Sequence, residues 1–279
     1  MKPAPFAYVR PSSLSDALAA LGRDPDAKVL AGGQSLLPLL SMRLAAPTML
    51  VDINGLPGLD DVRCTADGVR VGALARHSDV LASAEAERVQ PLLALALRHV
   101  AHATIRNRGT TVGSVVHADP ASELPAVLRL LGGSVDVEGP SGRRSIPADE
   151  LYVGPLETSI GHDEIAVEAT FPALAANAGV GFEEIARRHG DYAMAGVAAL
   201  VQLEGERVVS AKAGFFSVCD VPTVVDLTGV DDPGEAALAH LEPGADIHAS
   251  ADYRAHLVRV LTPRVLAAAT GHARGRAHV

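Results

Sequence analysis

The chain has 279 residues, of which 48% are hydrophobic, and it carries a formal net charge of -9 at pH 7. The apolar content is enough for a sizeable core and excludes an intrinsically disordered chain. The acidic balance and the aromatic content of 3%, with no Trp, argue against a nucleic acid as the partner.

The first part of the chain alternates apolar runs with helical segments, which indicates a small α/β unit. Ser13 is the expected N-cap of the first helix, with Asp16 three residues later, and Gly22 is expected to end it. Pro38 fits only the first turn of the second helix. The expected elements are strands at 6–10, 28–31 and 49–53, and helices at 14–22 and 36–44.

From Asn54 onward the pattern is mixed, and a boundary is expected at 172–179. Beyond it the chain reads as strands followed by helices, an α+β arrangement, and the tail 271–279 is expected to be frayed. The expected strands are 69–74, 134–138, 165–171, 181–187, 195–203 and 208–217, and the expected helices are 76–83, 91–101, 121–131, 234–241 and 252–269.

Cysteine is scarce, and no stretch of the chain is typical of a targeting or membrane segment. Cys64 and Cys219 are too few for an iron–sulfur cluster, a four-cysteine zinc site or a disulfide framework. The N-terminus shows no signal-peptide pattern, and apolar runs such as 92–97 fall far short of the roughly 20 residues that span a bilayer. We therefore expect a soluble cytoplasmic protein without a transmembrane segment, whose redox chemistry would need an organic cofactor or a partner.

The first candidate site is the run Ala31-Gly32-Gly33-Gln34-Ser35, directly after an expected strand. Glycine permits positive φ, so that successive backbone N–H groups can converge on an anion. The Ser35 hydroxyl and the start of the next helix add to this character. The run thus fits a pyrophosphate, although an ordinary tight turn is the alternative interpretation.

A second run, Arg106-Asn107-Arg108-Gly109-Thr110-Thr111-Val112-Gly113-Ser114, offers the same groups. Two such turns far apart in sequence favour a long ligand held from two sides, such as a dinucleotide. Asp119, before Pro120, is the expected N-cap of the following helix. His117 and Asp119 lack a third ligand at metal-site spacing, and Glu123 is suited to accept a hydrogen bond from a polyol. Fingerprints of Rossmann, P-loop and nucleophile-elbow sites are absent from the sequence.

Four motifs in this order carry a resemblance to a known family: 31–35, 105–114, 117–125 and 187–193. The sequence resembles the FAD-binding medium subunits of molybdenum hydroxylases of the carbon monoxide dehydrogenase and xanthine dehydrogenase type. The resemblance implies an α+β chain with a PCMH-type FAD-binding domain at 1–174, made of two α/β subdomains at about 1–55 and 56–174. It further implies a C-terminal domain at 178–279 with a small antiparallel sheet and helices, as in the carbon monoxide dehydrogenase flavoprotein.

The resemblance also implies the residues that bind FAD. The first turn and the second turn would hold the pyrophosphate, Glu123 the ribityl chain, and the backbone at Ile165 the flavin, with Tyr192 beside the isoalloxazine ring. No catalytic or metal-binding residue is expected in this chain. The implied cofactor-binding residues are Val29, Leu30, Ala31, Gly32, Gly33, Gln34, Ser35, Leu36, Thr110, Thr111, Val112, Gly113, Ser114, Glu123, Ile165 and Tyr192.

This sequence departs from the family pattern at two positions. Val112 stands where a glycine is usual, and because a β-branched residue resists positive φ, we expect either an extended Val112 or binding mainly through Gly113 and Ser114. Glu183 stands where some relatives have lysine, which argues against a flavin contact there. Tyr192 has an alternative interpretation as a half-buried aromatic of a strand.

The expected function is that of an FAD-carrying electron relay within a molybdenum hydroxylase. The resemblance implies a small partner with two [2Fe-2S] clusters and a large partner with the molybdenum cofactor, in a dimer of heterotrimers. FAD binding is expected to be non-covalent because neither turn contains His or Cys, although His99, His102 and His117 leave a histidyl link open. The alternatives are a stand-alone PCMH-type flavoprotein oxidase and a non-catalytic assembly subunit.

Overall fold

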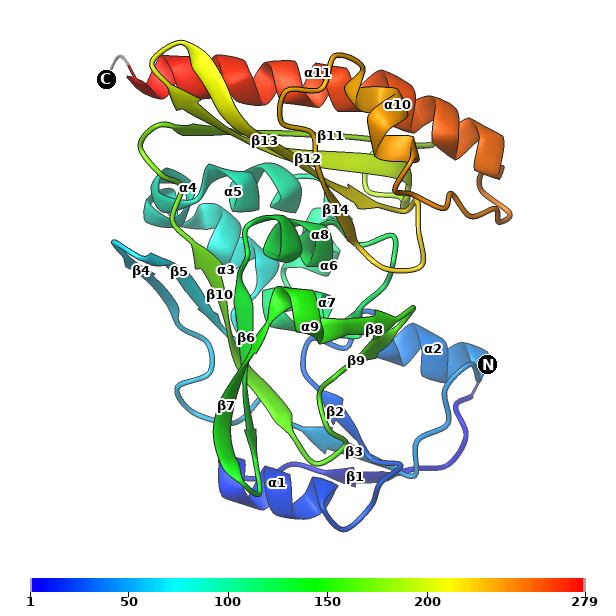
Figure 1. The fold of residues 1–279 in the computed structure, drawn as a ribbon. Coiled ribbons are helices and arrows are strands. Elements are labelled where there is room, and N and C mark those ends of the chain that lie inside the picture. The colour runs from blue at the N-terminus through cyan, green and yellow to red at the C-terminus, as the bar shows by residue number, and fades with distance from the viewer. Residues whose placement is uncertain (1, 278–279) are drawn as a thin grey trace.

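Three β-sheets follow one another from the bottom to the top of Figure 1. The structure is a computed structural model and describes residues 2–277. A small parallel sheet lies at one end, a larger antiparallel sheet in the middle, and a second antiparallel sheet under a long helix at the other end. A two-stranded hairpin lies beside the middle layer.

The first layer is a three-stranded parallel sheet in the order β1-β3-β2, as expected of an α/β unit. The Ser13 side chain caps the first helix by accepting a hydrogen bond from the backbone N–H of Asp16 at 3.1 Å, as predicted. Gly22 ends that helix. The elements are β1 Ala7–Val9, α1 Leu14–Leu21, β2 Lys28–Leu30, α2 Leu36–Met42 and β3 Met49–Asp52.

The middle layer is a five-stranded antiparallel sheet in the order β4-β5-β10-β6-β7, with helices packed on it. Its two edge strands, β4 and β7, were not predicted from the sequence. The strands are β4 Val62–Thr65, β5 Gly68–Gly72, β6 Ser134–Gly139, β7 Gly142–Pro147 and β10 Ile165–Pro172, with the hairpin strands β8 Tyr152–Gly154 and β9 Glu157–Thr158. The helices are α3 His77–Ala82, α4 Ala84–Val89, α5 Pro91–Leu97, α6 Ala103–Arg106, α7 Thr111–His117, α8 Glu123–Leu130 and α9 Ala148–Leu151.

The last layer is an antiparallel meander covered by one long helix. Its strands are β11 Ala178–Ala186, β12 Ala193–Glu204, β13 Arg207–Phe216 and β14 Thr223–Asp226, and its helices are α10 Pro233–Leu238 and α11 Ala251–Ala277. The expectation of a frayed tail is wrong for 271–277, which continue α11; residues 278–279 lie outside the described part of the chain. Between residues 2 and 277, no helix combines the length and apolarity of a membrane span.

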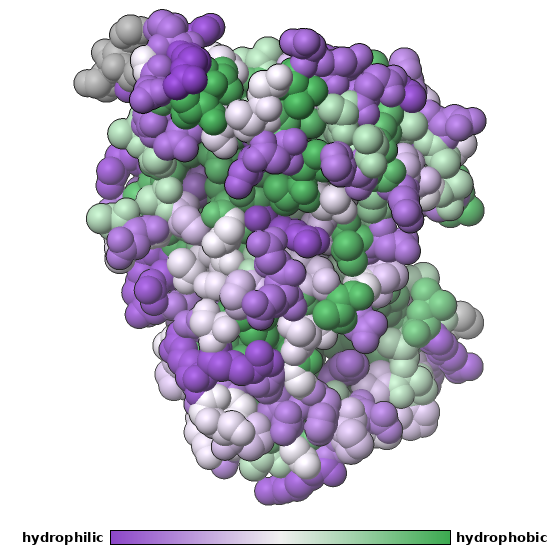
Figure 2. Space-filling model, viewed as in Figure 1, coloured by the Kyte–Doolittle hydropathy of each residue, from purple (hydrophilic) through white to green (hydrophobic). Residues whose placement is uncertain are grey.

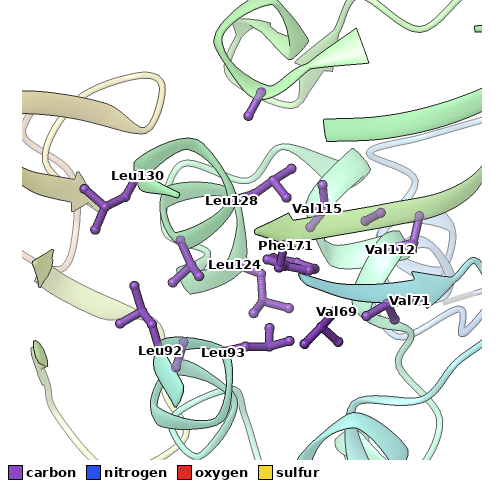
Figure 3. Close-up of a cluster of buried hydrophobic side chains, with 14 of the residues drawn as sticks. Val69, Val71, Leu92, Leu93, Val112, Val115, Leu124, Leu128, Leu130 and Phe171 are labelled. Atoms are coloured by element: carbon purple, nitrogen blue, oxygen red, sulfur yellow. The ribbon is translucent and has the colours of Figure 1, made fainter. Parts of the chain in front are cut away.

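The largest core cluster joins the middle layer to the last one (Figure 3). Val69 on β5 and Phe171 on β10 face Leu93 on α5 and Leu124 on α8. Leu128 and Leu130 carry the cluster further along α8. Burying such side chains contributes roughly 1.5–3 kcal/mol each, so α5, α7 and α8 are fixed firmly between the two sheets. This position fixes the start of α7 and of α8 relative to the neighbouring loops.

Candidate functional site

A pocket of about 930 Å³ lies where the three layers meet. Its size is at the upper end of the roughly 300–1,000 Å³ usual for ligand and cofactor sites. Every site residue implied by the sequence lines it except Thr111. In the space-filling view the surface is indented at the right, near α2, with apolar side chains beside the indentation (Figure 2).

The first glycine turn connects β2 to α2. Gly33 has φ +72°, a conformation that L side chains rarely adopt, so glycine is needed there. Its carbonyl accepts a hydrogen bond from the backbone N–H of Leu37 at 3.0 Å. The Gln34 side chain donates to the carbonyl of Gly32 at 3.0 Å, which closes the turn. The Ser35 hydroxyl makes no capping hydrogen bond to α2, so it is available to a ligand in the pocket.

The second turn is the start of α7. The Thr110 hydroxyl accepts a hydrogen bond from the backbone N–H of Gly113 at 3.2 Å. A Cβ at Gly113 would stand 2.4 Å from that hydroxyl, so the glycine permits the cap. The expectation of an extended Val112 is wrong: Val112 lies in the first turn of the helix and buries its side chain in the core. Helical φ is negative, and a β-branched residue is therefore tolerated there.

The two turns touch each other. A Cβ on Gly32 would lie 2.5 Å from the carbonyl oxygen of Arg108 and 2.9 Å from the backbone nitrogen of Thr110. Real Cβ atoms do not approach backbone this closely, so the contact requires glycine. Two segments separated by some 75 residues in the sequence thus form one continuous wall.

A polar clamp fixes this contact from behind. The Arg76 guanidinium donates to the carbonyl of Arg108 and to the Asn54 side-chain oxygen, each at 2.8 Å. The Asn54 amide in turn donates to the carbonyl of Ala31 at 2.8 Å. The clamp therefore connects a carbonyl of the first turn to a carbonyl just before the second.

His77 lines the pocket beneath the second turn and is neutral at physiological pH. Burial, and to a lesser degree the nearby Arg106 guanidinium, lowers its pKa to about 4. Its Nδ1 lies 3.2 Å from the Thr111 hydroxyl, which holds Thr111 behind the pocket wall rather than in it. Thr111, expected from the sequence to bind the cofactor, therefore does not line the pocket and contacts His77 instead.

Glu123 occupies the first position of α8 and is 8% exposed. The prediction that Asp119 caps this helix is wrong, because Ser122 stands at the N-cap position. Asp119 instead accepts a hydrogen bond from the backbone N–H of Ala121 at 2.9 Å and so closes the turn before the helix. Burial, with smaller contributions from Glu184 and Asp119, raises the pKa of Glu123 to about 8.

Tyr192 lines the pocket from the loop between β11 and β12, close to Asp119 and Glu123. It precedes β12 and is 61% exposed, so the interpretation as a half-buried strand aromatic is wrong. Desolvation of its hydroxyl, then the Asp119 and Glu123 carboxyl groups, raises its pKa. Glu183 does not line the pocket and pairs with Arg264 at 2.6 Å.

One wall of the pocket was missed by the sequence analysis. It comes from the β8–β9 turn and the segment before β10, and it includes Leu156, Ile160 and His162. Leu156 has φ +59° and donates its backbone N–H to the carbonyl of Ala118, itself at φ +53°, at 2.9 Å. Positive φ at two adjoining non-glycine residues marks a strained, over-determined position. The Gly154-Pro155 pair was a turn signal in the sequence, but it did not indicate where the turn would pack.

These groups fit a flavin dinucleotide. Backbone and hydroxyl donors gather at the two turns, where a phosphate would lie, and apolar residues such as Leu44, Ala46 and Ile165 line the remaining wall. His117 lies in the wall whereas His99 and His102 lie outside it, so the non-covalent attachment of FAD stays a prediction. Residues 2–277 hold no group of three or more His, Cys, Asp or Glu side chains arranged for a metal ion.

Comparisons with known proteins agree with this chemistry. Residues 4–174 match the family described as "FAD binding domain in molybdopterin dehydrogenase". The chain is 40% identical to the nicotine 6-hydroxylase medium subunit of Paenarthrobacter nicotinovorans, over 95% of this chain and 98% of the relative. It is 34% identical to the carbon monoxide dehydrogenase medium chain of Hydrogenophaga pseudoflava, over 96% of this chain and 98% of the relative. The structure of quinoline 2-oxidoreductase from Pseudomonas putida 86 superposes with a TM-score of 0.90 at 35% identity, covering 99% of this chain and 100% of that chain.

Proposed function

The chain belongs to the family of FAD-binding subunits of molybdopterin dehydrogenases, and on that premise we propose that it relays electrons inside a molybdenum hydroxylase complex. The relatives are named as medium, alpha or beta subunits, which agrees with a multi-subunit enzyme. We propose that the partners are a small subunit with [2Fe-2S] clusters and a large subunit with the molybdenum cofactor, assembled as a dimer of heterotrimers. Because this chain has two cysteines and a [2Fe-2S] cluster needs four, the clusters are assigned to a partner.

In this proposal both turns bind the pyrophosphate and Glu123 faces the ribityl chain. The backbone at Ile165 borders the flavin, and Tyr192 lies beside the isoalloxazine ring. The proposed residues are Val29, Leu30, Ala31, Gly32, Gly33, Gln34, Ser35, Leu36, Thr110, Val112, Gly113, Ser114, Glu123, Ile165 and Tyr192, all on the pocket wall. The proposed domain division at 1–174 and 178–279 assigns the two turns to one domain and Tyr192 to the other.

When bound, FAD supplies the means to take up electrons one at a time and to release them as a pair to an external acceptor. The residues of this chain bind it, orient it and exclude water from it rather than perform covalent chemistry. The neutral His77 adds no charge below the second turn. The Thr110 cap and the Arg76–Asn54 clamp hold the backbone donors in place before any ligand arrives.

The observation that supports this proposal most directly is the single pocket that collects the two turns, Glu123 and Tyr192 from distant parts of the sequence. The test is to purify the chain, add FAD, and compare its redox activity alone and with the two partner subunits. A relay reduces a dye with the substrate of the complex only when the partners are present. Turnover of an organic substrate by the chain alone would support a stand-alone oxidase, and a chain that takes up no FAD would contradict both.

A further inference from the structure

Glu123 is a buried carboxyl group without a cation. It lines the pocket and is 8% exposed, yet within residues 2–277 no Lys, Arg or His side chain lies at ion-pair distance from it. Moving a carboxylate out of water without a compensating charge is costly, and such groups usually keep their proton instead. The position of Glu123 therefore favours the neutral acid on physical grounds.

A second buried carboxyl group, that of Glu184, is among the acids that raise the pKa of Glu123. The Glu184 side chain, on β11, is 4% exposed, and its Oε1 lies 3.3 Å from the Nδ1 of His99. Its Oε2 is buried without a hydrogen-bond partner in the part of the chain that the structure describes. The ring of His99 packs against Phe182 with centroids 5.1 Å apart, and His99 is partly open to solvent. Glu184 thus has the His99 imidazole within ion-pair distance, whereas Glu123 has no Lys, Arg or His side chain there.

We propose that Glu123 stands in the pocket as a neutral carboxylic acid, kept protonated by the Glu184 carboxylate, and donates a hydrogen bond to the bound flavin cofactor. This inference rests on the proposed function, because it assigns the chemical role of one residue of the same pocket. A carboxylate can only accept hydrogen bonds, whereas a protonated carboxyl group both donates and accepts. The neutral form therefore offers an acceptor atom of the cofactor a partner that the ionised form cannot supply.

The groups around Glu123 act in opposite directions, and those that favour the proton prevail. Burial and the acids Glu184 and Asp119 raise its pKa to about 8, while its own backbone N–H at the start of α8 lowers it. The positive end of the α8 dipole also favours the anion. Tyr192 and His117 also line this end of the pocket and are uncharged at neutral pH, because burial lowers the pKa of His117 and the pKa of Tyr192 is raised. Asp191 lines the pocket beside Tyr192 and pairs with Arg188 at 3.6 Å.

The test is to titrate the cofactor-free chain with FAD between pH 6 and pH 9 and to follow the quenching of flavin fluorescence. We expect a constant dissociation constant below about pH 8 and, above it, a rise that approaches about tenfold for each pH unit. Glu123→Gln keeps a donor and an acceptor without a titrating proton, so its affinity should not change over this range. Glu184→Gln removes the neighbouring charge and should move the break to lower pH.

Glu183→Gln is the matched control, because Glu183 precedes Glu184 on the same strand but pairs with Arg264 away from the pocket. It should leave the break where the parent chain has it. Infrared spectra of the cofactor-free chain at pH 7 provide a second readout: a protonated carboxyl band should be present and should disappear in Glu123→Gln. FAD that binds with the same affinity from pH 6 to pH 9, or a spectrum without this band, would overturn the inference. Failure to bind FAD even at pH 6 would contradict the proposed function instead, and the infrared band would then decide the state of Glu123.

Discussion

Arg76 and Asn54 are joined by a hydrogen bond of 2.8 Å from guanidinium to side-chain carbonyl, and through this pair the two glycine turns are held together. Asn54 holds the carbonyl of Ala31, and Arg76 holds the carbonyl of Arg108. Neither side chain needs to touch the ligand for this effect. A binding site whose walls are positioned in advance loses less free energy on binding than one that must be ordered by its ligand.

Arg76→Gln should therefore weaken FAD binding without abolishing it. Glutamine cannot reach both carbonyl partners at once, so the turns lose one of their ties and must be ordered by the cofactor. We expect the affinity for FAD to fall about tenfold, equivalent to about 1.4 kcal/mol. Isothermal titration of the cofactor-free variant measures this change. Arg88→Gln, which removes a surface pair with Glu85, is the control and should bind FAD as the parent does; equal affinities in all three proteins would contradict the role of the clamp.

Gly32→Ala tests the contact between the two turns directly. Its Cβ would stand 2.5 Å from the carbonyl oxygen of Arg108, so one turn must move away from the other. We expect the affinity for FAD to fall about tenfold, equivalent to about 1.4 kcal/mol, and FAD occupancy at limiting cofactor to fall with it. Gly271→Ala, on α11 with open space around it, should keep full occupancy. The absorbance ratio of flavin to protein reports both results.

Gly33→Val and Gly113→Val should lower FAD affinity for different reasons. At Gly33 the backbone has φ +72°, which a β-branched residue resists, so the first turn must rearrange. At Gly113 the new Cβ would meet the Thr110 hydroxyl at 2.4 Å and break the cap of α7. We expect losses of about 2–3 kcal/mol, or roughly 30- to 150-fold in affinity. Full FAD in both variants at limiting cofactor would refute the two-turn site.

The burial of His77 predicts part of the pH dependence of the free energy of unfolding. Its folded-state pKa of about 4 lies below its ordinary value of 6.5. Between these two pH values the unfolded chain is therefore protonated at His77 whereas the folded chain is not. The resulting loss of unfolding free energy is absent above about pH 6.5, grows as the pH falls, and reaches about 3 kcal/mol near pH 4. His77→Gln removes this component, so urea unfolding at pH 7.5 and 4.5 should show a smaller loss of stability in the variant. Equal losses in the two proteins would show that His77 is not buried in its neutral form.

The hydrogen bonds of Arg254 hold the loop before α11 in place. Its guanidinium donates to the carbonyls of Met194 and Gly244, each at 2.9 Å, and to Asp246 at 2.8 Å. Although desolvation opposes it, the hydrogen bonds from Arg254 and from backbone amides lower the pKa of Asp246 to about 2. Arg254→Met removes the guanidinium donors from the two carbonyls and from Asp246 and should cost about 2 kcal/mol of unfolding free energy, given that Asp246 keeps its backbone donors and access to water.

Arg259→Met on the same helix is the matched control for that prediction. Arg259 pairs with Glu235 at the surface, where such pairs contribute about 1 kcal/mol or less. Thermal unfolding should therefore distinguish the two variants clearly. An Arg254 variant no less stable than the Arg259 variant would mean that the loop is held by other contacts.

Local signals were enough to predict the two turns. The run from Ala31 to Ser35 follows a strand and precedes a helix. Its glycines indicated a turn with positive φ, and the structure confirms positive φ at Gly33. The expectation for Val112 is wrong because the residue stands where a turn glycine is usual, whereas the Thr110 cap makes this position helical. Asp119 and Ser122 are both good N-cap residues, and only the packing of α8 decides between them.

The remaining features depend on contacts between distant segments. Strand β7 exposes most of its side chains, since only Ile146 is buried in the core, and is recognised by its backbone pairing with β6 rather than by apolar alternation. The tie between Leu156 and Ala118, and the approach of Glu184 to Glu123, join residues some 40 and 60 positions apart. No periodicity in the sequence records such neighbours, which is why the missed wall and the buried carboxyl pair emerged only from the fold.

Because the pocket is lined by residues of the first two sheets and of the loop between β11 and β12 in the third layer, a tightly held flavin connects all three layers. A ligand that binds only the folded state raises the free energy of unfolding. Loosening between layers, even at a contact as remote from the turns as the one between His99 and Phe182, would then release flavin and lower the flavin absorbance that stays with the protein. The flavin absorbance retained by a preparation therefore reports whether its layers are still packed against one another.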